Sequence, residues 1–463
     1  MPEIGSSLEK GLDPWITSQV YYHGYIPRQD VCSILTKHGD FLIRSTETEY
    51  TTKSKEVRRK ISPIICVILD PENIYEKSSE QERLEMVHNL IIHVKSGKTF
   101  LDPKHKFETA AELFQHHMKN PLIINEKEIS LTRGVGLTEW EFEHKHVNVG
   151  RLIGKGQYGE VRKGTLKLKS GTVVTVAIKS CKMDCAEISK EIIKEVMKEA
   201  RLMRELNHPN VVKLYGVGVL ERPLYILLEY VAGGALKSYL RKNKDFITKE
   251  ERSQMALGAA WGIEHLHKKN ILHRDIAARN CLYDQDSAVK ISDFGLSRIG
   301  AQYKMKTSKK MPIRWMAPES IATFMFTRKT DVYSFGVLIY EIYSSQDPYT
   351  ETGPGAVRKK IVDGEFNVFP IGTPDDLIKF VKEKMWNKDP EQRADMNKVV
   401  EFFERFAGLT ASAESVDIQR GTKNAKEGGI RGSDLSEEKK RELFLKLRKR
   451  TKNAPMKTQF TTD

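Results

Sequence analysis

The first third of the chain alternates short apolar runs with long polar stretches. Runs rich in β-branched residues predict strands at 40–44, 64–69 and 90–94. Apolar residues spaced as on one helix face predict helices at 28–35 and 109–118. The polar stretches are expected to be loops, at 45–60 and 72–85. This pattern predicts a small α+β domain over 21–134, with a central antiparallel sheet and two flanking helices.

A second pattern follows a short link at 135–146. It opens with two strands around a glycine-rich turn, continues with a third strand at 173–179 and a charged helix at 186–206, and becomes mainly helical from residue 247. This order predicts a larger α+β domain over 147–409, with its strands first and its helices afterwards.

The two ends of the chain are polar. Residues 1–20 are expected to form a lead-in to the first domain. The segment 410–463 carries thirteen Lys and Arg against eight Asp and Glu, and we predict that it is mostly disordered. Within it, 434–450 has the pattern of a basic amphipathic helix. A weak contact with an anionic membrane surface is the expected use of this basic tail.

Composition narrows the class of protein. The chain has 463 residues, of which 39% are apolar and 30% charged, and its net charge is +14. No apolar run is long enough to span a membrane, and the five scattered cysteines fit a reducing compartment. The N-terminus lacks the pattern of a signal peptide. We therefore expect a cytoplasmic protein, recruited at times to the inner face of the plasma membrane.

The glycine-rich turn has the chemistry of a phosphate-binding loop. Glycines allow the backbone to approach phosphate groups closely and to point N–H donors at them. A strand follows the turn instead of a helix, which argues against a dinucleotide site. The nucleotide-binding residues predicted here are Ile153, Gly154, Lys155, Gly156, Gln157, Tyr158, Gly159, Glu160 and Val161.

Lys179 ends the third strand, at 173–179, and is a candidate cation for two phosphates. A lysine in such a place needs a carboxylate partner, because an unpaired buried charge is costly. The charged helix offers Glu195 and Glu199, which lie one helical turn apart on one face. The spacing alone leaves both glutamates open as the partner.

Three further motifs follow in order. They are His273-Arg274-Asp275, Asp293-Phe294-Gly295 and Ala317-Pro318-Glu319. With the glycine turn and Lys179, they closely resemble the eukaryotic protein-kinase family, which implies a bilobal kinase domain. An ordered set of this length is far more specific than any one of its tripeptides.

The resemblance implies a role for each matching residue. Lys179 would hold the α- and β-phosphates of ATP, and Glu199 would be its partner, because Ala200 and Arg201 follow it as in the family. Asp275 would accept the proton of the substrate hydroxyl. Mg²⁺ would be held by Asn280 and Asp293. The implied cofactors are therefore ATP and Mg²⁺.

The motif details resemble the tyrosine-specific branch of the family. Arg279 lies four residues after Asp275, whereas the serine/threonine branch has a lysine two residues after the aspartate, where this chain has Ala277. Small residues and a displaced arginine leave room for a tyrosine side chain. Protein tyrosines are thus the implied substrates. Tyr303 lies in the implied activation segment and is predicted to be a self-phosphorylation site.

Other positions resemble the scaffold of a kinase domain. Asp331 resembles the aspartate that supports the catalytic loop, and Arg393 resembles the ion-pair partner of Glu319. Three residues depart from the usual tyrosine-kinase pattern and are expected to be packing positions: Tyr333, Met385 and Ala394.

The first domain resembles an SH2 domain. The resemblance rests on Tyr22-His23-Gly24, Ile26-Pro27-Arg28 and the run from Gly39 to Arg44. The planar guanidinium of an arginine can grip a phosphate with two donors, which a lysine cannot. The implied partners are phosphotyrosine-containing proteins.

Particular SH2 residues are implied to form the phosphotyrosine pocket. Arg44 is the candidate main cation and Arg28 the second, with Ser45 and Thr46 as loop donors. The family usually has a histidine on the third strand, where this chain has Asn89.

An SH2 domain directly before a tyrosine kinase most resembles the Fes/Fer group, here in a shortened form without that group's N-terminal membrane-binding region. In that group the SH2 packs on the kinase small lobe, and Trp140 in the link is expected at this junction.

Two alternative functions remain: a phosphotyrosine-dependent adaptor with an inactive kinase fold, and a protein that binds nucleic acid or membrane through its basic tail. The intact set of kinase residues favours the enzyme, and no RNA-binding motif supports a nucleic-acid partner.

Overall fold

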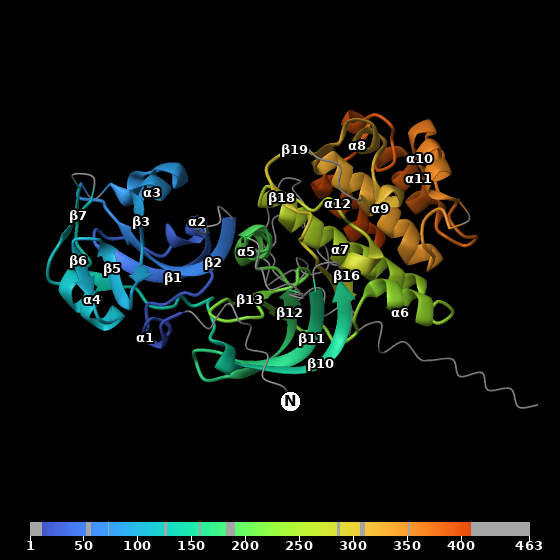
Figure 1. The fold of residues 1–463 in the computed structure, drawn as a ribbon. Coiled ribbons are helices and arrows are strands. Elements are labelled where there is room, and N and C mark those ends of the chain that lie inside the picture. The colour runs from blue at the N-terminus through green and yellow to red at the C-terminus, as the bar shows by residue number, and fades with distance from the viewer. Residues whose placement is uncertain are drawn as a thin grey trace, which may run out of the picture. The chain divides into compact units, whose positions relative to one another are not determined.

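The computed structural model of the chain describes residues 12–51, 57–72, 74–124, 127–156, 159–181, 190–284, 288–305, 311–350 and 352–408 (Figure 1). It divides into two compact units. The first comprises 1–201 and 214–230, and the second comprises 202–213 and 231–463. The predicted tail and its helix at 434–450 lie outside the described residues.

The part of the first unit that ends at Gly134 resembles an SH2 domain and is called the SH2 part. It is built on a sheet with strand order β3-β2-β1-β9. Its strands are β1 (Asp40–Thr51), β2 (Val57–Ile68), β3 (Val87–Ile91) and β9 (Arg133–Gly134). Helix α2 (Arg28–Val31) packs in the core on one face, with Leu42 and Cys66, and α4 (Ala110–His117) in the core on the other, with Phe41 and Ile65. Both helices are shorter than the sequence predicted. Smaller strands complete this part: β4 (His93–Lys95), β5 (Lys98–Asp102), β6 (His105–Phe107), β7 (Leu122–Ile124) and β8 (Lys127–Ile129).

Both stretches predicted as loops contain regular structure. Residues 45–51 and 57–60 extend β1 and β2 into a long antiparallel hairpin. The stretch 72–85 holds a short 3-10 helix, Tyr75–Lys77, and most of helix α3 (Glu80–Met86). Ser79 and Glu82 form a capping box at the start of α3, a signal that a polar composition hides.

The residues before Tyr21 are not merely a polar lead-in. Asp13 caps a short helix, α1 (Pro14–Thr17), by accepting a hydrogen bond from the backbone of Trp15. Ile16 is buried in the same core as Phe114 of α4, and Trp15 packs against that core. The packing of the SH2 part therefore begins N-terminal to the predicted boundary.

The rest of the first unit is a five-stranded antiparallel sheet with one long helix. The strand order is β10-β11-β12-β14-β13. The strands are β10 (Val147–Gly156), β11 (Gly159–Lys167), β12 (Val173–Cys181), β13 (Leu214–Gly218) and β14 (Tyr225–Glu229). The helix is α5 (Lys190–Arg204). The SH2 part and these strands form one unit, although the sequence places them in separate domains.

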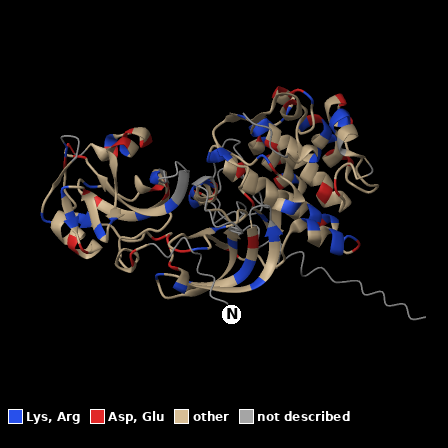
Figure 2. Ribbon diagram, in the orientation of Figure 1, with Lys and Arg blue, Asp and Glu red and all other residues tan. Residues whose placement is uncertain are grey.

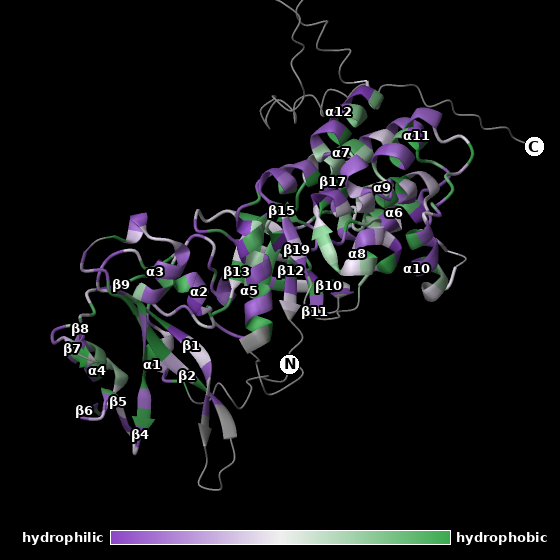
Figure 3. Cartoon of the chain, turned by 90° about the horizontal axis from the view of Figure 1, so that it is seen from above, coloured by the Kyte–Doolittle hydropathy of each residue, from purple (hydrophilic) through white to green (hydrophobic). Residues whose placement is uncertain are grey.

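The second unit is mainly helical. Its helices are α6 (Leu236–Lys242), α7 (Lys249–Lys268), α8 (Pro318–Thr323), α9 (Arg328–Ser344), α10 (Pro354–Asp363), α11 (Asp375–Lys384) and α12 (Met396–Phe406). Helices α7 and α9 are buried along most of their length, and α12 buries Val399 and Phe403. Figure 3 shows both hydrophobic and hydrophilic residues on α12. This unit also contains short two-stranded sheets between its helices. They pair β15 (Ile271–Leu272) with β18 (Arg298–Ile299), β16 (Cys281–Tyr283) with β17 (Val289–Ile291), and β19 (Gln302–Lys304) with β20 (Met325–Thr327).

The positions of Lys and Arg and those of Asp and Glu are interspersed along the helices and strands in Figure 2. None of the helices in the described residues is long and apolar enough to cross a membrane.

Candidate active site and phosphate-binding pocket

Lys179 of β12 forms an ion pair with Glu199 of α5 inside the first unit. The Lys179 ammonium lies 2.9 Å from each carboxylate oxygen of Glu199, which is 8% exposed. Glu195, one turn earlier on α5, is exposed. Of the two glutamates that the sequence left open, the structure therefore places Glu199 on Lys179. The charge of a partly buried lysine is balanced here by a two-point contact with a buried carboxylate.

The glycine-rich turn joins two paired strands. Gly156 and Gly159 are opposite each other at the tip, and Val161 on β11 is directly opposite Lys179 on β12. This register brings the turn and the lysine to the same end of the sheet. Gln157 and Tyr158, both predicted to bind nucleotide, lie outside the described residues.

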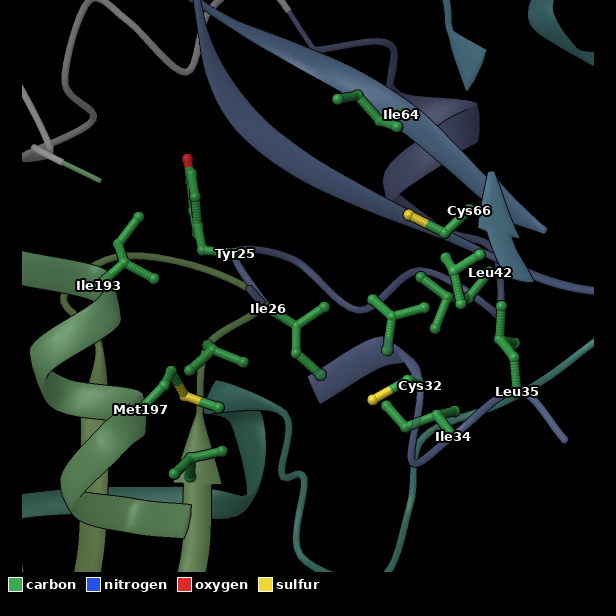
Figure 4. Close-up of a cluster of buried hydrophobic side chains, with 14 of the residues drawn as sticks. Tyr25, Ile26, Cys32, Ile34, Leu35, Leu42, Ile64, Cys66, Ile193 and Met197 are labelled. Atoms are coloured by element: carbon green, nitrogen blue, oxygen red, sulfur yellow. The ribbon is translucent and has the colours of Figure 1, made fainter. Parts of the chain in front are cut away.

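One hydrophobic cluster joins the SH2 part to helix α5 (Figure 4). Ile193 and Met197 of α5 lie in it together with Tyr25 and Ile26 of the SH2 part, and Trp140 of the link packs against it. The helix that carries Glu199 therefore has an apolar face covered by SH2 residues. Burial of such a face is the main force that holds a helix in place.

Polar contacts accompany this cluster. Arg201 of α5 lies 2.8 Å from Asp30 of α2, whose side chain is fully buried, and also donates to Gln29. Tyr25 donates its backbone N–H to the carbonyl of Val219. Gly24 has a φ of +58°, and an added Cβ would lie 2.2 Å from that same carbonyl oxygen. The SH2 backbone thus approaches the 219–220 loop as closely as a glycine allows.

The link is fastened by a buried pair, His23 and Glu141. One ring nitrogen of His23 lies 2.8 Å from a carboxylate oxygen of Glu141, and the other lies 2.9 Å from the carbonyl of Val135. Each ring nitrogen of His23 thus lies within hydrogen-bond distance of an oxygen. Burial opposes ionisation of Glu141, but His23 and two donors from Thr138 hold its pKa below the usual range.

The candidate phosphate pocket contains Arg44 on β1, which is 8% exposed. Its guanidinium donates to Cys66 on β2 at 3.2 Å and to Asn89 on β3 at 3.2 Å. Both of these partners are neutral. Arg28, the predicted second cation, is exposed and donates to the backbone carbonyls of Leu84 and Val87.

Ser45 does not line this pocket. Successive side chains of a strand point to opposite faces, so Ser45 faces away from Arg44. Its hydroxyl lies 2.9 Å from the hydroxyl of Tyr22, in the opposite core. Ser45 was predicted as a phosphate donor, and the hairpin that replaces the expected loop explains why its side chain is elsewhere.

The catalytic-loop candidates lie in the second unit. Asp331 of α9 accepts hydrogen bonds from the backbone N–H groups of His273 and Arg274, both at 2.9 Å. Burial opposes its ionisation, but a bond from His267 and these donors hold the pKa of Asp331 below its usual range. The loop that carries Asp275 is therefore anchored on a buried helix.

Two side chains hold the carboxylate of Asp275. Arg279 donates to one of its oxygens, and Asn280 donates to the other at 2.7 Å. Asn280 also donates to the backbone carbonyl of Asp275 at 2.8 Å. Because the amide nitrogen of Asn280 donates both hydrogen bonds to Asp275, its amide oxygen points away from Asp275.

The metal-binding candidates are Asn280 and Asp293. Asp293 has a left-handed φ of +59°, a conformation that non-glycine residues adopt sparingly and often at functional sites. An amide oxygen and a carboxylate are ligands suited to Mg²⁺, which usually takes few protein ligands besides substrate phosphates. The described residues hold no group of three or more His, Cys, Asp or Glu placed for a metal.

Tyr303 is half-buried on the ribbon strand β19. The guanidinium of Arg274 lies 4.4 Å from the centre of its ring, and that of Arg298 lies 5.2 Å away. Burial, and then the charge of Arg298, lower the pKa of Arg274 to about 10. Two arginines therefore already surround the predicted modification site.

The scaffold residues are buried as a group. Arg393 donates two hydrogen bonds to Glu319, at 2.6 and 2.8 Å. The three residues that depart from the usual pattern are all in the core: Tyr333, Met385 and Ala394. Their burial is what packing positions require.

The hydrogen bond from Trp315 to Glu341, near the catalytic loop, was not predicted from the sequence. Glu341 is 2% exposed on α9, a helix whose interior is otherwise largely apolar. A lone glutamate among apolar residues was the available signal, since such a residue needs a buried partner.

Comparison with known proteins agrees with this geometry. The profile of the protein tyrosine and serine/threonine kinase family matches residues 147–403, and that of the SH2 domain matches residues 21–117. The chain is thus a protein tyrosine kinase with an SH2 domain.

Its relatives include Fer-related kinase 1 of Caenorhabditis elegans, with 34% identity across 87% of this chain and 98% of the relative. Spermatocyte protein spe-8 of Caenorhabditis briggsae shows 32% identity across 84% of this chain and 71% of the relative. Human tyrosine-protein kinase Fer shows 33% identity, across 83% of this chain but 43% of that protein. The chain belongs to the Fer/Fps group of non-receptor tyrosine kinases.

Proposed function

We propose that this kinase transfers the γ-phosphate of ATP, bound with Mg²⁺, to tyrosine hydroxyls, with Asp275 as the base. The observation that carries the proposal is the fixed carboxylate of Asp275, held at one oxygen by Arg279 and at the other by Asn280. A base fixed in this way can orient the tyrosine hydroxyl and accept its proton as the phosphoryl group is transferred. Ala277, in place of a lysine, leaves space beside it.

The remaining roles follow from the chemistry of each side chain. Lys179, paired with Glu199, would hold the α- and β-phosphates as a positive point charge. The backbone of the glycine-rich turn would contact the phosphates through its N–H groups. Asn280 and Asp293 would hold Mg²⁺, which when bound neutralises charge on the phosphates.

The test is a phosphorylation assay of the full chain with tyrosine and serine peptides and Mg-ATP. Asp275→Asn should lower turnover by about 10²-fold or more, as expected for loss of a general base. Asp363→Asn, on the exposed end of α10, is the matched control and should keep full turnover. Wild-type turnover by Asp275→Asn would remove Asp275 from this role, and preference for serine peptides would contradict the tyrosine assignment.

The SH2 part supports two further roles. The buried Arg44, whose two bonded partners are neutral, favours an anionic ligand, and phosphotyrosine is the one that the family implies. The packing of SH2 residues on α5 favours a second role, in which this part holds Glu199 against Lys179. An inactive adaptor is disfavoured, because the Lys179–Glu199 pair and the Asp275 network are both assembled.

A further inference from the structure

Helix α9 places three buried polar side chains against the segments of the catalytic machinery. Asp331, in its first turn, holds the backbone of His273 and Arg274. Ser334 donates to the backbone carbonyl of Trp315 at 2.7 Å. Glu341, near the end of the helix, forms contacts that none of the motifs accounts for.

One carboxylate oxygen of Glu341 accepts two hydrogen bonds. The backbone N–H of Ala278, in the catalytic loop, lies at 2.8 Å, and the indole N–H of Trp315, in the activation segment, lies at 2.9 Å. A single buried atom thus ties two segments that are 37 residues apart in sequence. Hydrogen bonds to a charged acceptor are stronger than those between neutral groups.

The Trp315 side chain in turn supports the arginine beside the base. The guanidinium of Arg279 lies 4.0 Å from the centre of the Trp315 ring, and Arg279 donates to Asp275. The indole therefore has its N–H fixed by Glu341 and its face covered by Arg279. Movement of the indole would remove the surface on which this guanidinium rests.

We propose that Glu341 is a positioning residue for the tyrosine substrate, acting through Trp315 on Arg279 and through Ala278 on the catalytic loop. The proposal rests on the tyrosine transfer proposed above. It adds that Glu341, which does not contact Asp275 itself, fixes the position of the side chains beside that base.

Opposing effects act on the ionisation of Glu341. Burial raises the pKa of Glu341 to about 7, against the opposing bonds from Ala278 and Trp315 and the charge of Arg279. Asp347 adds a repulsive charge nearby. Glutamine, which keeps an acceptor oxygen without the charge, and leucine, which keeps neither, therefore separate charge from hydrogen bonding.

The test compares steady-state kinetics of wild type, Glu341→Leu, Trp315→Phe and the double variant. Trp315→Phe keeps an aromatic face and removes only the indole N–H. We expect Trp315→Phe to raise the KM for a tyrosine peptide about threefold or more with kcat little changed. Glu341→Leu should raise the peptide KM about tenfold and also lower kcat, and Glu341→Gln should lie between it and wild type. The KM for ATP should not move in any of them.

The double variant tests the connection itself. Its peptide KM should equal that of Glu341→Leu, because the two residues act through one contact. Multiplied effects, or an equal rise in the KM for ATP, would overturn the proposal. Wild-type tyrosine transfer in the same assay tests the proposed function separately.

A measurement independent of activity completes the test. In ¹⁵N-labelled protein, the indole N–H signal that disappears in Trp315→Phe should be shifted in Glu341→Gln and exchange faster with solvent. An unchanged signal would show that Glu341 does not hold the indole, whatever the kinetics. Thermal unfolding of each variant checks that a kinetic change does not come from loss of the fold.

Discussion

Arg201 of helix α5 and Asp30 of the SH2 helix α2 form an ion pair of 2.8 Å in which the aspartate side chain is fully buried. Arg201 follows two residues after Glu199, the partner of Lys179. The SH2 part therefore contacts the kinase helix within one turn of its functional glutamate. A contact so placed can influence the position of Glu199 without touching nucleotide or substrate.

We expect Arg201→Ala to reduce kinase activity about fivefold or more, the lower range of an allosteric coupling. Removing one member of a buried pair leaves the other charge without compensation. The measurement is peptide phosphorylation by the full chain. Restored activity in the exchanged pair Asp30→Arg/Arg201→Asp would support direct coupling. Equal activity of Arg201→Ala and wild type would show that the pair is not needed.

Gly24→Ala should weaken docking of the SH2 part, because the new Cβ would lie 2.2 Å from the oxygen of Val219 and 2.3 Å from the Cα of Leu220. Activity should fall several-fold, together with the melting temperature. Gly97→Ala is a matched control: its φ is also positive, at +75°, but nothing lies within 4 Å of the added atom. The two variants share the backbone strain of about 1 kcal/mol. If they lose equal activity, strain and not docking is the cause.

Arg44→Leu should lower the affinity for a phosphotyrosine peptide by about 10²-fold, since charge-assisted bonds to phosphate are strong. Calorimetric titration of the full chain measures this. Basal kinase activity without peptide should persist, because the hydrogen-bond partners of Arg44, Cys66 and Asn89, lie on β2 and β3 and not on α5. Undiminished binding would show that the phosphate is bound elsewhere in the chain.

Tyr303→Phe should lower the activity of enzyme that has been incubated with ATP. A phosphate on Tyr303 would add about two negative charges beside Arg274 and Arg298, and these arginines already lie over its ring. Mass spectrometry should find the phosphate on the peptide that contains Tyr303. Activity equal to wild type after such incubation would leave Tyr303 without a regulatory role.

The His23–Glu141 pair predicts a pH dependence of stability. Because the folded-state pKa of Glu141 lies below its ordinary value, its contribution is complete above about pH 4.3 and is lost as the pH falls through the folded-state pKa. Glu141→Gln should destabilise the protein at neutral pH and flatten this acid dependence. Glu139→Gln, two residues away with an 89% exposed side chain, is the control. Acid unfolding followed by tryptophan fluorescence measures both, and identical curves would contradict the assignment.

Several parts of the site could be predicted from local sequence. Lys179, Asp275, Asn280 and Asp293 lie in short motifs that resemble those of the protein-kinase family, and this resemblance predicted their roles in phosphoryl transfer. The resemblance to the SH2 family likewise placed Asn89 at a pocket position, and in the structure Asn89 accepts a hydrogen bond from Arg44. Such predictions are possible because each depends on residues that are neighbours along the chain.

Other features depend on segments that are distant in sequence. The spacing of Glu195 and Glu199 does not decide between them; the family resemblance favours Glu199, and the contact between β12 and α5 confirms it. The stretch 72–85 has the polar composition of a loop but contains most of α3. Tyr75, a buried residue of this stretch, donates a hydrogen bond from its hydroxyl to the carbonyl of Cys32, which is distant in sequence.

By itself, then, the sequence determined the kinase and SH2 classes and predicted the reacting side chains, because its motifs resemble those of the two families. Only the tertiary structure decided that the SH2 part and the first kinase strands form one unit, and that Glu341 binds Trp315 and Ala278. These depend on which apolar faces cover each other and on which buried polar atoms then meet. No local pattern encodes that pairing, because the burial of each residue is decided by partners far away along the chain.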